Sequence, residues 1–322
     1  MSPPSLSLGT AAWTLSPSDT CQQDEMLQIA RTHGITAIDT ARLYGQGISE
    51  SFLGQRNVAS EFEITTKAPT GFLPNSATKS AIIQNGTLSL EALKTSKVPI
   101  YLLHGPDESV PLSETLDGVQ GLYLKGAFER FGLSNFSLPQ IREVYEYNKS
   151  KGYVLPTVYQ SIYNLVARNN EIDLFPALRD LGFSIQVYSP IASGFLVKKP
   201  EDIEQQKGRW DPSTVEGKLL QGLYGKPELL SFLREYIQLA ETSGSSQAGL
   251  AYRWVRYNSA LRGDLGDMVL LGANGPQQLR NTLADLDQGP LEEWVVERLD
   301  ALWEGIREVA PVDNLTVWKA MA

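Results

Sequence analysis

Four polar residues of types that can move a proton lie at or just after the ends of apolar segments: Asp39, Tyr44, Lys67 and His104. A free tyrosine has a pKa of about 10, which makes it a poor acid at neutral pH. A lysine cation beside it favours the phenolate and lowers that pKa, and an aspartate keeps the lysine charged and in place. A histidine on the same face can hydrogen-bond a carbonyl oxygen, so the set could protonate an oxygen that develops negative charge.

Each of these residues also has a structural explanation. Asp39 could cap a turn, Tyr44 could be a packing residue in its glycine-containing loop, and His104 could be a satisfied core histidine. Lys67 is the hardest to explain in this way, because a lysine that ends the apolar segment 62–67 loses its hydration unless a carboxylate pairs with it. A carbonyl that receives a hydride develops negative charge on its oxygen, and since no side chain supplies a hydride, the set implies a nicotinamide cofactor.

The later apolar segments contain groups that could hold such a cofactor: Ser134, Asn135, Gln160 and Tyr188. Hydroxyl and amide groups can bind a carboxamide, and the tyrosine offers a flat face for a ring. Gly194 and Lys198 follow the seventh segment. After the eighth, residues 272–276 lead into the predicted N-terminus of a helix, where free N–H groups and the helix dipole favour phosphate.

The elements that must position these residues are eight short apolar segments that alternate with amphipathic ones: 6–11, 37–41, 62–67, 100–104, 130–133, 157–161, 184–189 and 268–272. They show no polar alternation, as expected for parallel strands covered on both faces. Eight strand–helix units fit a (β/α)8 barrel or a doubly wound sheet, and the strand count and chain length favour the barrel. A doubly wound dinucleotide fold should carry Gly-x-Gly-x-x-Gly after its first strand, whereas residues 9–13 read Gly-Thr-Ala-Ala-Trp.

We therefore predict an α/β fold, a (β/α)8 TIM barrel with an additional C-terminal helix, in a single domain that spans residues 1–322. Two regions interrupt the βα rhythm. Residues 195–226 are predicted to form a long loop after strand seven, and residues 290–322 to form a helix over 291–309 followed by a tail. Catalytic groups of such a barrel lie at the carboxyl ends of the strands, so the polar strand ends can converge on one face.

Helix-start signals precede four of the amphipathic segments: Thr20 with Gln23, Ser49, Ser137 with Gln140, and Pro276. The first and third are capping-box patterns, and the proline is tolerated at a first helical position because its missing N–H would be unpaired there. We expect helices to begin at these residues.

The composition excludes several classes of protein. The chain has 28 Lys and Arg against 37 Asp and Glu, and its net charge of −9 disfavours nucleic acid binding, which needs a phosphate-neutralising surface. The single cysteine, Cys21, cannot form an internal disulfide, and two histidines with one cysteine are too few for a structural zinc site, so no metal is expected. No secretory signal is recognisable and no apolar run approaches the ~20 residues of a membrane helix, so we expect a cytoplasmic protein.

In the order in which they occur, these residues make the sequence resemble the aldo-keto reductase superfamily over nearly the whole chain. The motifs that carry the resemblance are residues 37–41 with Tyr44 and 49–50, then 66–67, 103–104, 132–135 and 155–160. Residues 156–163, and residues 268–271 followed by 278–279, most resemble the aflatoxin-aldehyde reductase branch.

The resemblance implies a (β/α)8 barrel that reduces aldehydes and ketones with NADPH. Its catalytic tetrad would be Asp39, Tyr44, Lys67 and His104, with Tyr44 as the acid. Trp13, together with Tyr44 and His104, is expected to contact the substrate.

The implied cofactor contacts are spread over the strand ends, the segment after strand seven and the last βα turn. They are Asp39, Ser134, Asn135, Gln160, Tyr188, Ser189, Pro190, Ile191, Gly194, Leu196, Lys198, Arg209, Asn274, Gln278, Arg280, Asn281 and Thr282. The candidates for the cation that holds the 2′-phosphate of NADPH are Lys198, Arg209 and Arg280.

Three positions depart from the family pattern. Asn281-Thr282 replaces the usual Glu-Asn or Gln-Asn pair near the adenine, and Ser193-Gly194 replaces a Gly-Gly pair after strand seven. The branch often ends in an arginine that reaches an acid group of the substrate, whereas residues 318–322 contain none. A larger and less charged carbonyl is therefore expected rather than a small acidic aldehyde.

The prediction is an NADPH-dependent oxidoreductase that reduces a small-molecule aldehyde or ketone to an alcohol in a biosynthetic or detoxification pathway. One alternative is a redox-sensing regulatory subunit that binds the cofactor and turns over slowly, against which the complete tetrad and the lack of an extra N-terminal segment argue. Another is a barrel isomerase or lyase that uses no cofactor. The resemblance also implies a homodimer.

Overall fold

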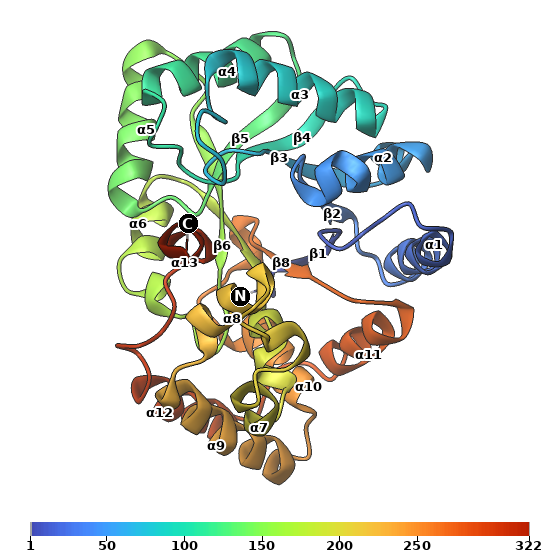
Figure 1. Ribbon diagram of the computed structural model, residues 1–322, viewed down its shortest axis with the longest axis vertical. Coiled ribbons are helices and arrows are strands. Elements are labelled where there is room, and N and C mark those ends of the chain that lie inside the picture. The colour runs from blue at the N-terminus through green and yellow to red at the C-terminus, as the bar shows by residue number, and fades with distance from the viewer. Residues whose placement is uncertain (1, 322) are drawn as a thin grey trace.

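The computed structural model describes residues 2–321 and shows a closed barrel of eight parallel strands with helices around it (Figure 1). The strands are β1 (Ser5–Gly9), β2 (Ala37–Asp39), β3 (Glu63–Ala68), β4 (Val98–Leu103), β5 (Phe128–Ser134), β6 (Pro156–Ile162), β7 (Ser184–Tyr188) and β8 (Met268–Leu271). Each strand pairs with the next one in sequence, and β8 closes the barrel against β1. The predicted (β/α)8 barrel is confirmed, and each of the eight apolar segments overlaps one strand.

The parallel register brings the carboxyl ends of neighbouring strands together. Asp39 at the end of β2 lies opposite Thr65 of β3, and Lys67 near the end of β3 lies opposite Leu102 of β4. Gln160 of β6 lies opposite Ser134 at the end of β5. The polar strand ends therefore meet at one end of the barrel, as the sequence pattern predicts.

Ile100 and Leu102 of β4 and Val158 of β6 form a small apolar cluster separate from the larger core. Gly132 of β5 is required there, because a Cβ at this position would lie 2.4 Å from Leu102 Cδ2 and 2.5 Å from the carbonyl oxygen of Val158. The larger core lies between the strands and the surrounding helices. The strands are thus covered on both faces, which explains their lack of polar alternation.

Thirteen α-helices are found among residues 2–321: α1 (Pro17–Thr32), α2 (Ile48–Gln55), α3 (Lys79–Leu93), α4 (Leu112–Leu124), α5 (Leu138–Lys151), α6 (Leu174–Asp180), α7 (Pro200–Glu204), α8 (Val215–Tyr224), α9 (Pro227–Ser243), α10 (Gln247–Arg253), α11 (Pro276–Leu286), α12 (Glu293–Glu304) and α13 (Asn314–Met321). None of the helices in this part of the chain is long and apolar enough to cross a membrane.

Two of the four predicted helix starts are confirmed. The backbone N–H of Ser137 donates to Gln140 Oε1 at 2.9 Å in a capping box, and α11 begins at Pro276. The other two are wrong. Thr20 lies inside α1, which begins three residues earlier at Pro17, and Ser49 lies inside α2, where tertiary contacts rather than the helix end engage its side chain.

The segment after β7 and the C-terminal region are more helical than the sequence pattern indicates. Residues 195–226, expected as a loop, contain α7 and α8. The helix expected over 291–309 ends at Glu304, and a further helix, α13, lies in the expected tail. Helix α13 packs against α8 and, through Trp318, against Phe72 of the loop after β3 (Figure 1).

Candidate active site

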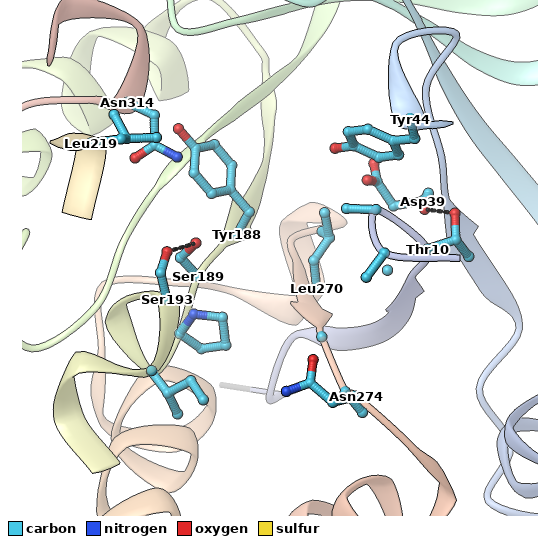
Figure 2. A pocket seen from close by; sticks show the side chains of 18 of the residues that line it. Thr10, Asp39, Tyr44, Tyr188, Ser189, Ser193, Leu219, Leu270, Asn274 and Asn314 are labelled. Atoms are coloured by element: carbon cyan, nitrogen blue, oxygen red, sulfur yellow. Dashed lines mark hydrogen bonds between the residues drawn. The ribbon is translucent and has the colours of Figure 1, made fainter. Parts of the chain in front are cut away.

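A cavity of about 880 Å³ opens at the carboxyl ends of the strands. Tyr44 and Asp39 line one side of it, and Tyr188 and Ser189 face them from the other, with Leu270 and Asn274 between (Figure 2). Its walls also include Trp13, His104, Asn135, Gln160, Pro190, Ile191, Gly194, Lys198, Arg209 and Gln278. The structure therefore brings most of the sequence-predicted site residues to one cavity.

Lys67 joins Asp39 and Tyr44 beneath the cavity. Its Nζ donates to Asp39 Oδ2 at 2.7 Å, to the carbonyl oxygen of Thr40 at 2.9 Å and to Tyr44 Oη at 3.4 Å. The Lys67 side chain is fully buried and Asp39 is nearly so. Burial acts to lower the pKa of Lys67, but Asp39 and Tyr44 raise it by more, so the amine stays charged.

The pKa of Tyr44 is raised above its ordinary value of 10.0. Burial is the main cause, while Lys67 acts in the opposite direction and Asp39 adds to the increase. The net direction differs from the one expected from the lysine alone, because the ring loses more hydration than the cation compensates. The phenol is therefore fully protonated at neutral pH, and the cation remains in place to stabilise the phenolate once the proton leaves.

His104 lies in the cavity wall beside the phenol of Tyr44. Its ring makes an edge contact with Tyr44 at a centroid distance of 5.7 Å and with Phe72 at 4.9 Å. Burial, with a further contribution from the Lys67 cation, holds the pKa of His104 well below its usual 6.5. The imidazole is thus neutral at physiological pH and can donate a hydrogen bond to an oxygen without placing a second charge in the site.

The loop that carries Tyr44 is held by a buried ion pair. Residues 45–47 all have left-handed backbone angles, and Gly47 packs so closely on Arg42 that a Cβ would lie 2.2 Å from its Nη1. Arg42 Nη1 donates to Glu50 Oε2 at 3.0 Å, and Thr66 Oγ1 donates to Glu50 Oε1 at 2.6 Å. Glu50 is fully buried, so these contacts replace the water that its carboxylate has lost.

A chain of buried hydroxyl groups fastens the same loop to β1. Ser49 Oγ donates to Thr10 Oγ1 at 2.7 Å and lies 2.9 Å from Thr40 Oγ1, and Thr10 Oγ1 donates to the carbonyl oxygen of Asp39 at 3.0 Å. Two polar networks thus anchor the segments on both sides of Tyr44.

The amide side chains predicted to hold a carboxamide are partly engaged within the protein. Gln160 Nε2 donates to Asp39 Oδ1 at 2.8 Å and to Gln186 Oε1 at 2.9 Å, which leaves Gln160 Oε1 to accept from a ligand. Asn135 Nδ2 donates to the carbonyl oxygen of His104 at 2.9 Å, and Asn135 Oδ1 accepts from Tyr188 Oη at 2.7 Å. Asn135 therefore ties the backbone of His104 to the ring of Tyr188.

Among residues 2–321, two cationic side chains line the cavity. They are Lys198 and Arg209, both from the segment after β7. Arg209 Nη1 donates to the carbonyl oxygen of Ser193 at 3.4 Å, and its Nε and Nη2 donate to Glu216 Oε1 at 2.9 and 2.7 Å. Both partners of this ion pair are about half exposed. The guanidinium thus stands at the cavity with a counter-ion that water can replace.

Several predicted contacts lie outside the cavity lining. Leu196 is fully buried in the core, and Ser134 and Thr282 are buried behind the wall. Arg280 faces outward and pairs with Glu25 of α1 at 2.8 Å. Asn281 Oδ1 accepts from Gln277 Nε2 at 2.8 Å on the exposed side of α11. Of the three candidates for the 2′-phosphate, the cavity thus includes Lys198 and Arg209 but not Arg280.

The cavity also has lining residues that the sequence pattern did not reveal: Leu43, Phe72, Leu73, Val197, Leu219, Asn314 and Trp318. Phe72 and Leu73 lie in the loop after β3, so the rule that strand-end loops form the active face could have found them. No sequence pattern indicates that Trp318 lines the cavity, because only the packing of α13 on the rest of the barrel brings it there. Within residues 2–321, no group of three or more His, Cys, Asp or Glu side chains is placed to hold a metal ion.

The sequence of this chain is similar to those of known oxidoreductases. A model of the Aldo/keto reductase family matches residues 5–304. Oxidoreductase sirO of Leptosphaeria maculans is 38% identical over 294 residues, which cover 91% of this chain and 89% of that protein. Aflatoxin B1 aldehyde reductase member 2 of Rattus norvegicus is 33% identical over 294 residues, covering 86% of this chain and 79% of that protein.

A solved structure has the same fold. The aldo/keto reductase from Klebsiella pneumoniae, in complex with NADP and acetate, aligns with a TM-score of 0.68 at 24% sequence identity. The alignment covers 93% of this chain and 91% of that one.

Proposed function

The chain belongs to the aldo/keto reductase family, and from that premise we propose that it reduces an aldehyde or ketone to an alcohol with NADPH, using Tyr44 as the proton donor. The observation that carries the proposal is the buried Asp39–Lys67–Tyr44 network, with neutral His104 beside it. The rat relative is named as an aldehyde reductase and the Klebsiella pneumoniae enzyme holds NADP, and both support the same reaction class.

The residues around the cavity fit NADPH. Lys198 and Arg209 supply positive charge on one side. Helix α11 begins at Pro276, next to the lining residue Asn274, so its N-terminal N–H groups can receive a phosphate. Tyr188 and Gln160 Oε1 provide a flat ring and an acceptor near the catalytic residues, as a nicotinamide carboxamide requires. A volume of about 880 Å³ is of the size that holds a cofactor together with a small substrate.

When bound, NADPH supplies the hydride. The protein's own residues handle the oxygen of the carbonyl. Tyr44 Oη holds the proton, because burial keeps its pKa high, and Lys67 stabilises the phenolate left after the proton has moved. Asp39 keeps Lys67 charged, and the neutral His104 orients the carbonyl oxygen toward the phenol.

Two measurements test the proposal. Titration with NADPH is expected to quench the protein's tryptophan fluorescence, because Trp13 and Trp318 line the cavity. Incubation with NADPH and a panel of uncharged and charged aldehydes and ketones is expected to consume NADPH and release the matching alcohol in equal amounts. Absence of quenching would contradict cofactor binding, and quenching without alcohol formation from any carbonyl would contradict the reductase.

A further inference from the structure

One end of the cavity is built from aromatic rings. Phe72, from the loop after β3, makes edge contacts with His104 at 4.9 Å and with Trp318 of α13 at 6.1 Å. Leu73 and Leu43 line the cavity as well. Because the rings reach the catalytic histidine directly, a group attached to the carbonyl under attack would lie against them.

Helix α13 is fixed in its place over this end. Leu315 is buried against Gly105, where a Cβ would lie 2.6 Å from Leu315 Cδ2, and Val317 packs on Gly222 of α8, where a Cβ would lie 2.7 Å from Val317 Cγ1. Helix α13 thus packs closely on two glycines, which have no side chain to hold it away. This packing fixes Trp318 in the cavity wall.

The aromatic end carries no charge of its own. Among the described residues that line the cavity, the charged side chains are Asp39, Lys198 and Arg209. Asp39 is neutralised by Lys67, and Arg209 is held by Ser193 and Glu216 in the region after β7. Lys319, the residue after Trp318, donates to the carbonyl oxygen of Pro106 and pairs with Glu108, outside the cavity lining.

We propose that the substrate is an uncharged carbonyl with a flat ring that packs against Phe72 and Trp318, and that Trp318 excludes carboxylate-bearing carbonyls. The inference rests on the proposed reductase activity. A carboxylate placed against these rings would lose its hydration without gaining a cation, which is strongly unfavourable. An aromatic ring placed there gains apolar burial and edge contacts instead.

The test uses carbonyl pairs that differ in one property. With 4-formylbenzoate and its methyl ester, wild-type protein is expected to show a kcat/KM at least about tenfold higher for the ester, because the acid leaves an unpaired charge. With benzaldehyde and cyclohexanecarbaldehyde, Trp318→Leu is expected to lower kcat/KM for the flat ring about three- to tenfold more than for the saturated one.

A charge placed at the aromatic end should weaken or remove the preference for the ester. Trp318→Arg is expected to raise the acid-to-ester ratio of kcat/KM about tenfold or more, through a charge-assisted hydrogen bond to the carboxylate. Leu73→Arg should shift the ratio in the same direction without disturbing α13, because Leu73 is 63% exposed. Ala320→Arg adds the same charge to an exposed position of α13 and should leave the ratio unchanged.

Each variant is first titrated with NADPH, so that a failure to fold is recognised. Wild-type protein that reduces the acid as well as the ester would overturn the inference, as would equal shifts from Trp318→Arg and Ala320→Arg. These outcomes leave the reductase activity intact. Failure of the proposed function is distinct, since then none of the four carbonyls would consume NADPH.

Discussion

Two charged pairs of the cavity differ in their exposure to water: Lys67 with Asp39 at its bottom, here called the floor, and Arg209 with Glu216 at its edge, here called the rim. At the floor, the side chains of Lys67 and Asp39 are 0% and 4% exposed. At the rim, those of Arg209 and Glu216 are 52% and 55% exposed. The floor pair makes further hydrogen bonds to Thr40 and Tyr44, while the rim pair faces water.

This difference shows which parts of the site are set in advance. Buried charges lose a large hydration energy if a partner moves, so the floor holds one arrangement with or without a ligand. An exposed ion pair contributes little and can exchange its partner at small cost. We expect the floor to determine the chemistry and the rim to determine how the anionic cofactor is captured.

The largest expected effect is on kcat, when the Tyr44 hydroxyl group is removed from the floor. Tyr44→Phe removes the hydroxyl proton but keeps the ring and its edge contact with His104, and kcat should fall about 10²- to 10⁴-fold. The affinity for NADPH, measured by fluorescence titration, should stay close to that of wild type. Tyr123→Phe, on the exposed face of α4, is the matched control and should retain activity. Wild-type turnover by Tyr44→Phe would show that another group donates the proton.

The second change removes an ion pair from beneath the Tyr44 loop. Glu50→Gln should lower the free energy of unfolding by about 3 kcal/mol, because Arg42 loses its buried anion while one hydrogen bond remains. It should also lower kcat with little change in NADPH affinity, since the loop that positions Tyr44 loosens.

Urea denaturation of Glu50→Gln and Glu61→Gln compares the two kinds of pair directly. Glu61 pairs with Arg31 on the surface at 2.7 Å, so its loss should cost about 1 kcal/mol or less. Equal losses of stability from the two variants would contradict the contrast between buried and exposed pairs.

The third prediction concerns pH. The pKa of folded His104 lies well below 6.5, whereas the unfolded chain binds a proton there below about pH 6.5. The unfolded state thus binds more protons, and stability should fall as the pH drops, by about 1.4 kcal/mol per pH unit below 6.5. The free energy of unfolding of wild type and of His104→Asn, measured by denaturation between pH 7 and pH 5, tests this loss of stability. The variant should lose less stability on acidification, and identical slopes would show that His104 does not contribute.

The smallest effect is expected at the rim. Glu216→Gln frees Arg209 for the cofactor phosphates and should tighten NADPH binding by up to about fivefold, with a stronger dependence on salt. Glu204→Gln, which breaks the exposed pair with Arg234, is the matched control and should leave the affinity unchanged. Weaker binding by Glu216→Gln would mean that Glu216 holds Arg209 in its binding position instead of competing for it.

The residues that the sequence predicted well lie at the ends of strands. Asp39, Lys67 and His104 each lie at or near the end of an apolar segment. Parallel strands carry their carboxyl ends to one edge, so the convergence of these residues follows from the pattern. The same logic placed Gln160 and Tyr188 at the cavity. The strand order followed from the eight apolar segments and the chirality of βα units, whereas the register came from the structure.

Residues on helices were harder to place, because each side chain's direction depends on how the helix packs. Arg280 and Asn281 belong to α11, which begins beside the cavity, but their side chains contact α1 and solvent. Leu196 belongs to the segment after β7 that borders the cavity, but its side chain is buried in the core. Trp318 is separated from its neighbour Phe72 by most of the chain, so no local pattern could connect them.

The sequence by itself therefore determined the barrel, the family and the identity of the groups at the strand ends, because these depend on local periodicity and on order along the chain. Only the tertiary structure decided the net direction of the Tyr44 pKa, the partner of each rim cation and the aromatic wall made with α13. Those properties depend on burial and on contacts between distant segments, which arise when the chain is packed.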